Sequence, residues 1–112
     1  MQEFIYLFRG GQPTEDATED QLIAHEEAWD EWMDVLEEEG ALIDGLPMTD
    51  IGMMVTEDGM QEGDFGSGDG VGGYLIIECE DLDKATELAS DCPIFEFAGK
   101  VEVRALINER GE

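Results

Sequence analysis

The sequence predicts an α+β fold in which two helices cover one face of an antiparallel sheet. Its apolar and polar stretches follow the order strand, helix, strand, strand, helix, strand, which is typical of a ferredoxin-like βαββαβ plait, here with an extra hairpin. Two helices can cover only one sheet face, yet the first and third predicted strands are apolar on both faces. A second copy is therefore expected to cover the open face, which gives a homodimer built as a dimeric α+β barrel. The whole chain, 1–112, is long enough for one such domain.

The first strand is predicted at Phe4–Phe8, an apolar run without polar alternation that residues 9–13 break with two glycines and a proline. A helix is expected to begin after Thr18, because Gln21 three residues later completes a capping box. The helix is expected to stop at Gly40, a residue type common just beyond a helix end.

This first helix has a one-sided pattern between residues 22 and 36. At about 100° per residue, one arc collects Leu22, His25, Trp29, Trp32, Met33 and Leu36. The opposite side is a nearly unbroken row of carboxylates, namely Glu26, Glu27, Asp30, Glu31, Asp34, Glu37 and Glu38. Both tryptophans and the only histidine therefore face the predicted sheet, and any chemistry is expected near them.

The middle of the chain is predicted to hold a strand at Ala41–Gly45 and a hairpin at Ile51–Gln61. The turn of the hairpin is expected at Glu57-Asp58-Gly59, a typical turn sequence between two apolar runs. Glycine then supplies half of the twelve residues from 62 to 73, which predicts a flexible loop.

The third strand is predicted at Tyr74–Cys79, and Asp81 is expected to cap a second helix that continues to Asp91. The inner side of that helix is predicted to carry Leu82, Ala85, Leu88 and Ala89. Pro93 is expected to end it, and the last strand is predicted at Val101–Ile107. In that strand, Val101, Val103, Ala105 and Ile107 share one face, and Glu102, Arg104 and Leu106 share the other.

The net charge of −25 comes from 30 acidic against 5 basic residues. Carboxylates about 5–6 Å apart on a helix are screened well only when the Debye length falls to about 3 Å, at molar salt. We interpret the charge as adaptation to a salt-loaded cytoplasm, and an ordinary acidic protein is the alternative.

The scattered bases argue against nucleic acid, and the absence of a long apolar run argues against a membrane or secreted protein. Two cysteines are too few for a disulfide framework and are expected to be small buried residues.

Several segments together resemble the YCII-related proteins, in the branch marked by an Asp-Gly-Pro-Phe motif. The segments that carry the resemblance are Phe4–Gly11, Ala24-His25, Gly40–Leu42, Leu46-Pro47, Gly72–Tyr74, Asp81–Asp83, Cys92–Phe97 and Val101–Arg104. The resemblance implies a ferredoxin-like dimer, in agreement with the strand pattern. It also implies a small-molecule site with a histidine and an aspartate near the end of the first strand, and relatives are linked to elimination of hydrogen chloride from aromatic compounds.

His25 matches the helix histidine of that family, whereas the strand-end aspartate is replaced by the segment Arg9-Gly10-Gly11-Gln12. The branch motif is altered to Glu62-Gly63-Asp64-Phe65. His25 is predicted to act as a general base beside a carboxylate such as Asp44, Glu62 or Asp64. The alternative is a core histidine that bonds a backbone carbonyl.

The candidate ligand-binding residues are Arg9, Asp64, Phe65, Tyr74 and Arg104. Arg9 is predicted to steady a small anionic organic ligand, because a guanidinium binds a carboxylate with two hydrogen bonds. Arg104 could do the same, or it could pair with Glu102 or with the other subunit. One histidine and two separated cysteines are too few for a zinc site, and neither a metal nor a cofactor is expected.

Two functions are consistent with these residues. In the first, a cytoplasmic homodimer carries out lyase-like or isomerase-like proton transfer with His25 as the base. In the second, the protein is a ligand-binding or regulatory module without catalysis, which the missing aspartate favours.

Overall fold

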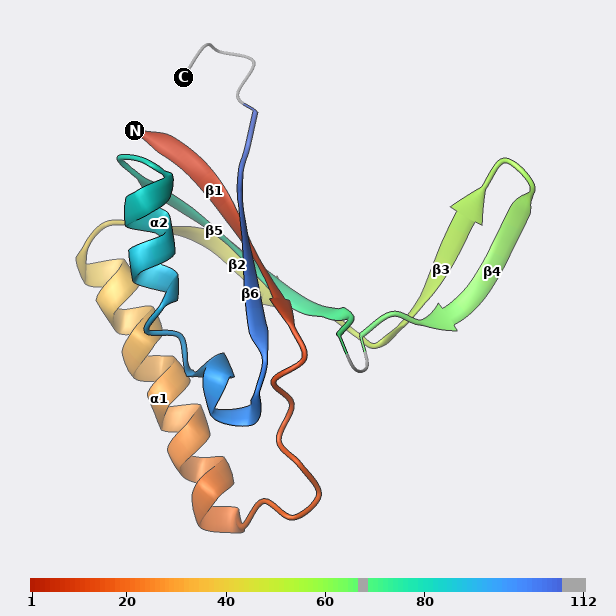
Figure 1. The fold of residues 1–112 in the computed structure, drawn as a ribbon, viewed down its shortest axis with the longest axis horizontal. Coiled ribbons are helices and arrows are strands. Elements are labelled where there is room, and N and C mark those ends of the chain that lie inside the picture. The colour runs from red at the N-terminus through yellow and green to blue at the C-terminus, as the bar shows by residue number, and fades with distance from the viewer. Residues whose placement is uncertain (67–68, 108–112) are drawn as a thin grey trace.

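The computed structural model of the chain describes residues 1–66 and 69–107. Its elements are β1 (Gln2–Arg9), α1 (Glu19–Glu38), β2 (Leu42–Pro47), β3 (Ile51–Thr56), β4 (Gly59–Asp64), β5 (Val71–Cys79), α2 (Leu82–Ala89), the 3₁₀ helix η1 (Pro93–Phe97) and β6 (Lys100–Ala105). This order confirms the predicted βαββαβ plait with an extra hairpin (Figure 1).

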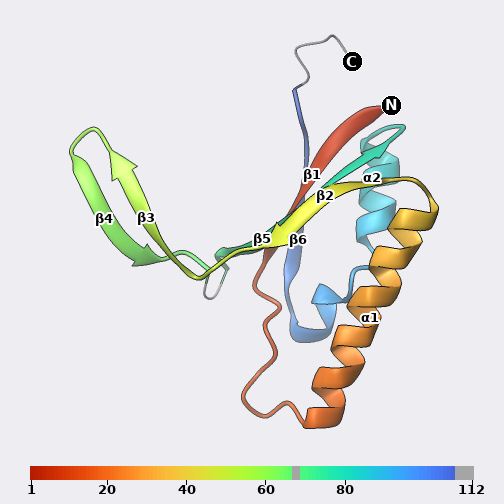
Figure 2. The same ribbon diagram turned by 180° about the vertical axis from the view of Figure 1, so that it is seen from behind.

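The main sheet has the strand order β2-β5-β1-β6, and each neighbouring pair is antiparallel. Both helices lie on the same side of this sheet (Figures 1 and 2). In the centre, Tyr6 of β1 lies between Leu75 of β5 and Val103 of β6. The fold is therefore the α+β plait that the sequence predicts, with one face covered by helices.

The core lies between the helices and the inner face of the sheet. Tyr6 is completely buried and stacks on Trp32, with ring centroids 6.1 Å apart. Its hydroxyl donates a hydrogen bond to the carbonyl of Ala85 on α2, and Trp32 Nε1 donates one of 3.0 Å to the carbonyl of Leu88. Because both polar atoms have partners, these two large rings are buried without the cost of an unpaired donor.

The predicted ends of α1 are confirmed. Thr18 Oγ1 accepts from the Gln21 amide, and the Gln21 side chain accepts from the Thr18 amide, so the capping box is complete. At the other end Gly40 has a φ of 70°, the left-handed conformation that favours glycine after a helix. His25 is buried on the inner side as expected, whereas Leu22 is 39% exposed because it lies in the first turn, beyond the sheet.

The segment after β5 differs from the prediction in four ways. The helix α2 ends at Ala89 rather than Asp91, and Leu82 at its start is 51% exposed rather than buried. Pro93 opens the 3₁₀ helix η1 instead of only ending α2, because proline suits the first position of a helix. The last strand, β6, ends at Ala105, two residues before the predicted end.

The outer side of the main sheet, here called the open face, is apolar at its centre. Residues alternate along β1 between buried side chains, such as Phe4, and half-buried ones on the open face. The open-face side chains at the centre are Ile5, Leu7, Tyr74 and Ile76. The prediction of an apolar outer face is confirmed, and within residues 1–66 and 69–107 no helix covers it.

The hairpin β3–β4, here called the arm, forms a separate two-stranded sheet that projects away from the main sheet (Figures 1 and 2). Thr56 pairs with Gly59, so a two-residue turn connects the strands at the predicted place. The arm is longer than expected, because β4 continues to Asp64 rather than Gln61. The loop between β4 and β5 is shorter than the predicted glycine-rich loop, because β5 already begins at Val71. The radius of gyration is 15.6 Å, whereas a compact chain of this length has about 13 Å.

The two edges of the main sheet are β2 and β6. The register between β2 and β5 shifts between Leu42 and Asp44, which leaves Ile43 as the extra residue of a bulge, and β2 ends at Pro47. The other edge, β6, carries Lys100, Glu102 and Arg104 on the open face.

Candidate functional site

A cleft of about 570 Å³ lies between α1 and the end of the main sheet. Its walls are mostly apolar and come from β1, α1, β2, β5, η1 and the loop after β1. The lining residues are Phe8, Gly10, Gly11, Gln12, Pro13, Trp29, Asp30, Met33, Gly45, Leu46, Pro47, Gly72, Gly73, Tyr74, Leu75 and Ile94. A volume of this size holds a small organic molecule.

Two glycines allow the chain segments around this α1 cleft to come close together. Gly11 has a φ of 74°, and a Cβ there would overlap the Ile94 side chain. At Gly45, a Cβ would overlap the side chain of Leu75. Residues with side chains would force these walls apart, so both glycines help to define the shape of the cleft.

Trp29 connects the cleft to the buried histidine. Its indole forms part of the cleft wall and packs edge-on against Phe8, with ring centroids 5.2 Å apart. Its Nε1 donates a hydrogen bond of 3.0 Å to Nε2 of His25, one turn earlier on α1. A ligand that touches this indole would therefore contact a group bonded directly to the imidazole.

The other imidazole nitrogen faces a carboxylate. Nδ1 of His25 lies 2.6 Å from Oε1 of Glu96 on η1, and the ring of Phe97 packs edge-on against the imidazole at 4.7 Å. Since Nε2 accepts from Trp29, the neutral imidazole carries its proton on Nδ1 and donates to Glu96. His25 is 8% exposed and does not line the α1 cleft itself.

The predicted carboxylate partner of His25, Asp44, Glu62 or Asp64, was wrong. The carboxylate that contacts the imidazole belongs to Glu96. The contact joins residues 71 positions apart, and η1 brings them together. A core histidine bonded to a backbone carbonyl is also wrong, since both nitrogens bond side chains.

A second cleft, of about 640 Å³, lies where the arm meets the main sheet. Three of the candidate ligand-binding residues line it: Arg9, Asp64 and Phe65. Tyr74 lines the α1 cleft instead, and Arg104 lines neither. The structure therefore divides the predicted ligand-binding set between separate places.

The two arginines share one carboxylate on the open face. Arg9 Nε lies 3.0 Å from Glu102 Oε1, and Arg104 Nη1 lies 3.8 Å from Glu102 Oε2. Arg9 also donates to the carbonyl of Asp69. The predicted pairing of Arg104 with Glu102 is confirmed, and at 69% exposure the Arg104 side chain is largely in solvent.

Both cysteines are free and buried, as predicted. Burial raises the pKa of the Cys92 thiol to about 12, and it also raises the pKa of Cys79. Neutral buried thiols are poor nucleophiles, so these residues serve the core.

A comparison of the sequence with family descriptions matches the YCII-related domain over residues 9–110. The chain belongs to this family. Among solved structures, it is similar to 5-chloro-2-hydroxyhydroquinone dehydrochlorinase from Burkholderia phenoliruptrix AC1100 in complex with 2,5-dihydroxybenzoquinone. That likeness has a TM-score of 0.55 at 18% identity and covers 98% of this chain and 99% of the other. No curated protein gives a significant match.

In this YCII-related protein, the altered motif Glu62–Phe65 lies at the end of β4 and just beyond it. The ring of Phe65 packs against Gly52 and Gly63 on one side of the arm, which places it in the second cleft rather than near His25.

Across residues 1–66 and 69–107, no three side chains among His, Cys, Asp and Glu gather as a metal site would require. None of the helices in these ranges could span a membrane.

Proposed function

We propose that this YCII-related protein binds a small uncharged ring compound in the α1 cleft and transfers a proton on it, with His25 as the base. The observation that carries the proposal is the chain of contacts from the cleft to Trp29, from Trp29 to His25, and from His25 to Glu96. The structural neighbour, a dehydrochlorinase with a quinone ligand, supports a ring-shaped ligand and lyase-type chemistry.

The proton transfer uses the lone pair of His25 Nε2, which the Trp29 indole occupies in the structure. A ligand that turns this indole aside frees Nε2 to take a proton from an acidic C–H of the ring. The C–H electron pair stays on the ligand as an enolate, and the Nδ1–H group remains bonded to Glu96, which stabilises the imidazolium. Return of the proton to another carbon completes an isomerisation, and departure of an anionic leaving group completes an elimination.

The lining of the cleft favours an uncharged ligand. Among the lining residues that the structure describes, Asp30 is acidic and none is a lysine or an arginine. Arg9, which the sequence suggested for an anionic ligand, lines the second cleft and is paired with Glu102. An anion in the α1 cleft would be repelled by Asp30 and by the net charge of −25.

The second candidate is a ligand-binding module without catalysis. A specific observation favours it: both nitrogens of His25 already have hydrogen-bond partners, and His25 does not line the cleft. In that case Trp29 and its partners hold the cleft wall rigid, and the bound molecule is released unchanged.

Binding and exchange experiments distinguish the candidates. The protein is titrated in KCl with neutral benzoquinones, hydroquinones and cyclic ketones, and tryptophan fluorescence reports binding. Nuclear magnetic resonance in D₂O follows deuterium uptake at ring carbons. If the protein is an enzyme, the wild type should promote deuterium uptake and His25→Gln should abolish it. The control Arg104→Gln, remote from the cleft, should leave the uptake unchanged.

Binding without protein-dependent uptake would establish the second candidate. Uptake that persists in His25→Gln would refute the role of the base. If none of these compounds binds, or if Trp29→Phe leaves the fluorescence response unchanged, the α1 cleft is not the ligand site.

We also propose that a second copy covers the open face, because Ile5, Leu7, Tyr74 and Ile76 form an apolar surface there. Sedimentation equilibrium in molar KCl should give twice the chain mass of 12.4 kDa. A species that stays at the mass of one chain would refute the dimer.

A further inference from the structure

The arm has two unlike faces. Strand alternation and the β3–β4 register place the carboxylates of Glu62 and Asp64 on one of them, here called the bare face. The same face carries four aliphatic side chains: Ile51, Met53, Val55 and Met60. Each of the four is between 55% and 75% exposed. On the other face the ring of Phe65 covers Gly52 and Gly63, and Met54 lies nearer the turn.

The arm needs a partner. An isolated two-stranded hairpin is marginally stable in water, and the arm belongs to a separate sheet that shares no strand with the main one. Four exposed aliphatic side chains grouped on one face of the arm are unusual on a chain with a net charge of −25 and mark an interaction site. The arm projects away from its own main sheet, so the same chain does not cover the bare face (Figures 1 and 2).

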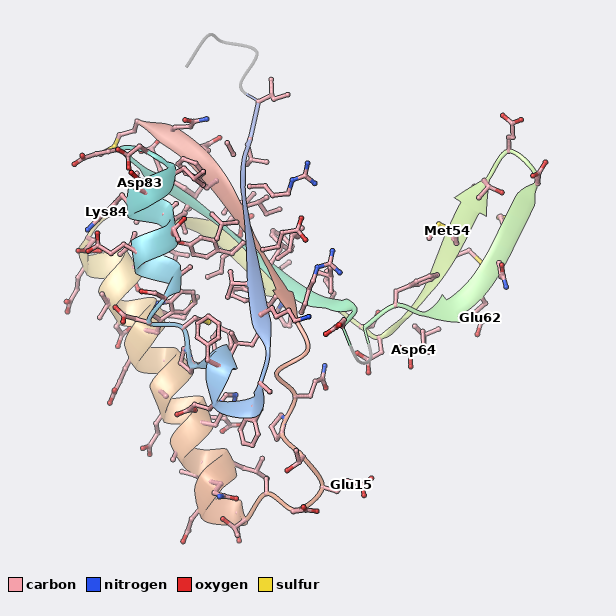
Figure 3. All side chains as sticks on the ribbon, viewed as in Figure 1. Glu15, Met54, Glu62, Asp64, Asp83 and Lys84 are labelled. Carbon is pink, nitrogen blue, oxygen red and sulfur yellow. The ribbon has the colours of Figure 1, made fainter. Side chains whose placement is uncertain are left out.

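The open face of the main sheet complements the arm in charge. Of the four basic residues that residues 1–66 and 69–107 contain, three lie along β1 and β6 on this face, where they contact Glu102 and Asp69. Arg9 and Lys100 are opposite each other at one end of the two strands, and Arg104 lies opposite Ile5, nearer the centre. The fourth, Lys84, is on α2, at the opposite end of the molecule from the arm (Figure 3). The arm carries acidic side chains at its turn and along β4, namely Glu57, Asp58, Glu62 and Asp64.

The sizes of the two surfaces also agree. Six-residue strands make the arm about 20 Å long, and four strands make the main sheet about 14 Å wide between its outer strands. The accessible surface of the chain is 7819 Å², about 1,700 Å² more than its mass predicts. That excess is about twice the roughly 800 Å² per partner that a stable interface needs.

We propose that the bare face of the arm packs on the open face of a second copy, and that the two copies exchange arms around a twofold axis. The acidic side chains of each arm, at its turn and along β4, then lie near Arg9, Lys100 and Arg104 of the other chain. This inference rests on the homodimer proposed above and names the segment that holds it together. The exchange is reciprocal, so each dimer contains two identical arm contacts.

Adjacent residues on the arm provide a matched test. Val55→Glu places a charge on the bare face, and Met54→Glu places the same charge on the opposite face. In 2 M KCl, sedimentation velocity should show that Val55→Glu raises the dimer Kd by about 100-fold or more, because each of two contacts would bury an unpaired carboxylate. Met54→Glu should leave the Kd within about threefold.

Charge reversal tests the other surface. At 0.3 M KCl, Arg104→Glu should raise the dimer Kd by about tenfold, while Lys84→Glu on α2 should change it less than threefold. Equal effects of the two reversals would show general repulsion and would overturn the charge pairing with the arm.

Other outcomes distinguish failure of the proposed arm exchange from failure of the proposed ligand site. A wild-type dimer that Val55→Glu leaves intact, or that both arm variants disrupt equally, refutes arm exchange while the ligand site remains testable by fluorescence. If Val55→Glu fails to fold, hydrogen exchange of the wild type decides. Amides of the arm should exchange at least tenfold faster after dilution below the dimer Kd, and equal rates would refute the inference.

Discussion

The carboxylates of α1 should make the stability of this protein depend on salt, and Asp34 is the position at which the effect is largest. The exposed acids of the central and last turns are Glu26, Glu27, Asp30, Glu31, Asp34, Glu37 and Glu38. They form three pairs at i,i+3 and four at i,i+4, and α1 contains no lysine or arginine. Asp34 takes part in four of these seven pairs.

Each like-charge pair of this kind costs about 0.2–0.5 kcal/mol at low salt, so the seven pairs together cost about 2–3 kcal/mol. Asp34→Asn removes four of them and should raise the free energy of unfolding by about 1–2 kcal/mol in dilute buffer. For a domain of this size, that corresponds to an increase in Tm of about 5–10 °C. At molar KCl the Debye length, about 3 Å, is shorter than the spacing of the charges, and the benefit should fall to a few tenths of a kcal/mol.

The measurement is thermal unfolding by circular dichroism, from 0.1 to 3 M KCl, for the wild type and two variants. Glu15→Gln is the control, because it removes the same charge from the loop between β1 and α1 (Figure 3). The Tm of the wild type should rise with KCl more steeply than that of Asp34→Asn. If the two variants behave alike, the repulsion is not local to α1. A wild-type Tm that is flat across the range would refute both this reasoning and the predicted adaptation to salt.

Three further predictions test the packing. Gly11→Ala should lower the free energy of unfolding in urea by about 2–5 kcal/mol, because the left-handed backbone is strained and the new Cβ overlaps a neighbour. Gly40→Ala should lower it by only about 1–2 kcal/mol, because Gly40 has a φ of 70° but nothing within 4 Å of a Cβ. Equal losses would contradict the tight contact at Gly11. Tyr6→Phe should lose about 1–2 kcal/mol by the same assay, because the carbonyl of Ala85 loses its donor, and no loss would mean that water replaces the bond. The pKa of Cys92 is raised from 9.0 to about 12, so the unfolded thiol ionises first and stability should fall as pH rises from about 9 toward 12. Cys92→Ala should flatten that alkaline decline in Tm, and an unchanged slope would argue against a buried neutral thiol.

The local structure of this chain could be predicted because its signals lie within a few residues. The box of Thr18 and Gln21, the cap at Asp81 and the turn after Thr56 each depend on residues at most three positions apart. The apolar outer side of β1 was also predictable, because strand alternation is a local property. Leu82 was misplaced since helical periodicity does not show where the sheet stops covering a helix.

The site was harder to predict, because its central contact is not local. Glu96 reaches His25 across 71 positions through η1, a short 3₁₀ helix whose place beside α1 no local sequence pattern indicates. The bond from Trp29 to His25 could have been predicted, since the two residues are four apart on one face of α1. The placement of Arg9 at the second cleft depends on where the arm leaves the sheet, which composition does not indicate.

The borders of the main sheet affect how safely such a protein can be concentrated. A regular edge strand offers free backbone donors and acceptors, and in concentrated salt little charge repulsion remains to keep neighbouring molecules apart. Here the bulge at Ile43 and the proline at position 47 interrupt one border, and charged side chains line β6 at the other. At the β2 border, strand-by-strand growth into fibrils is therefore hindered by the backbone itself, a safeguard that does not weaken as the salt concentration rises.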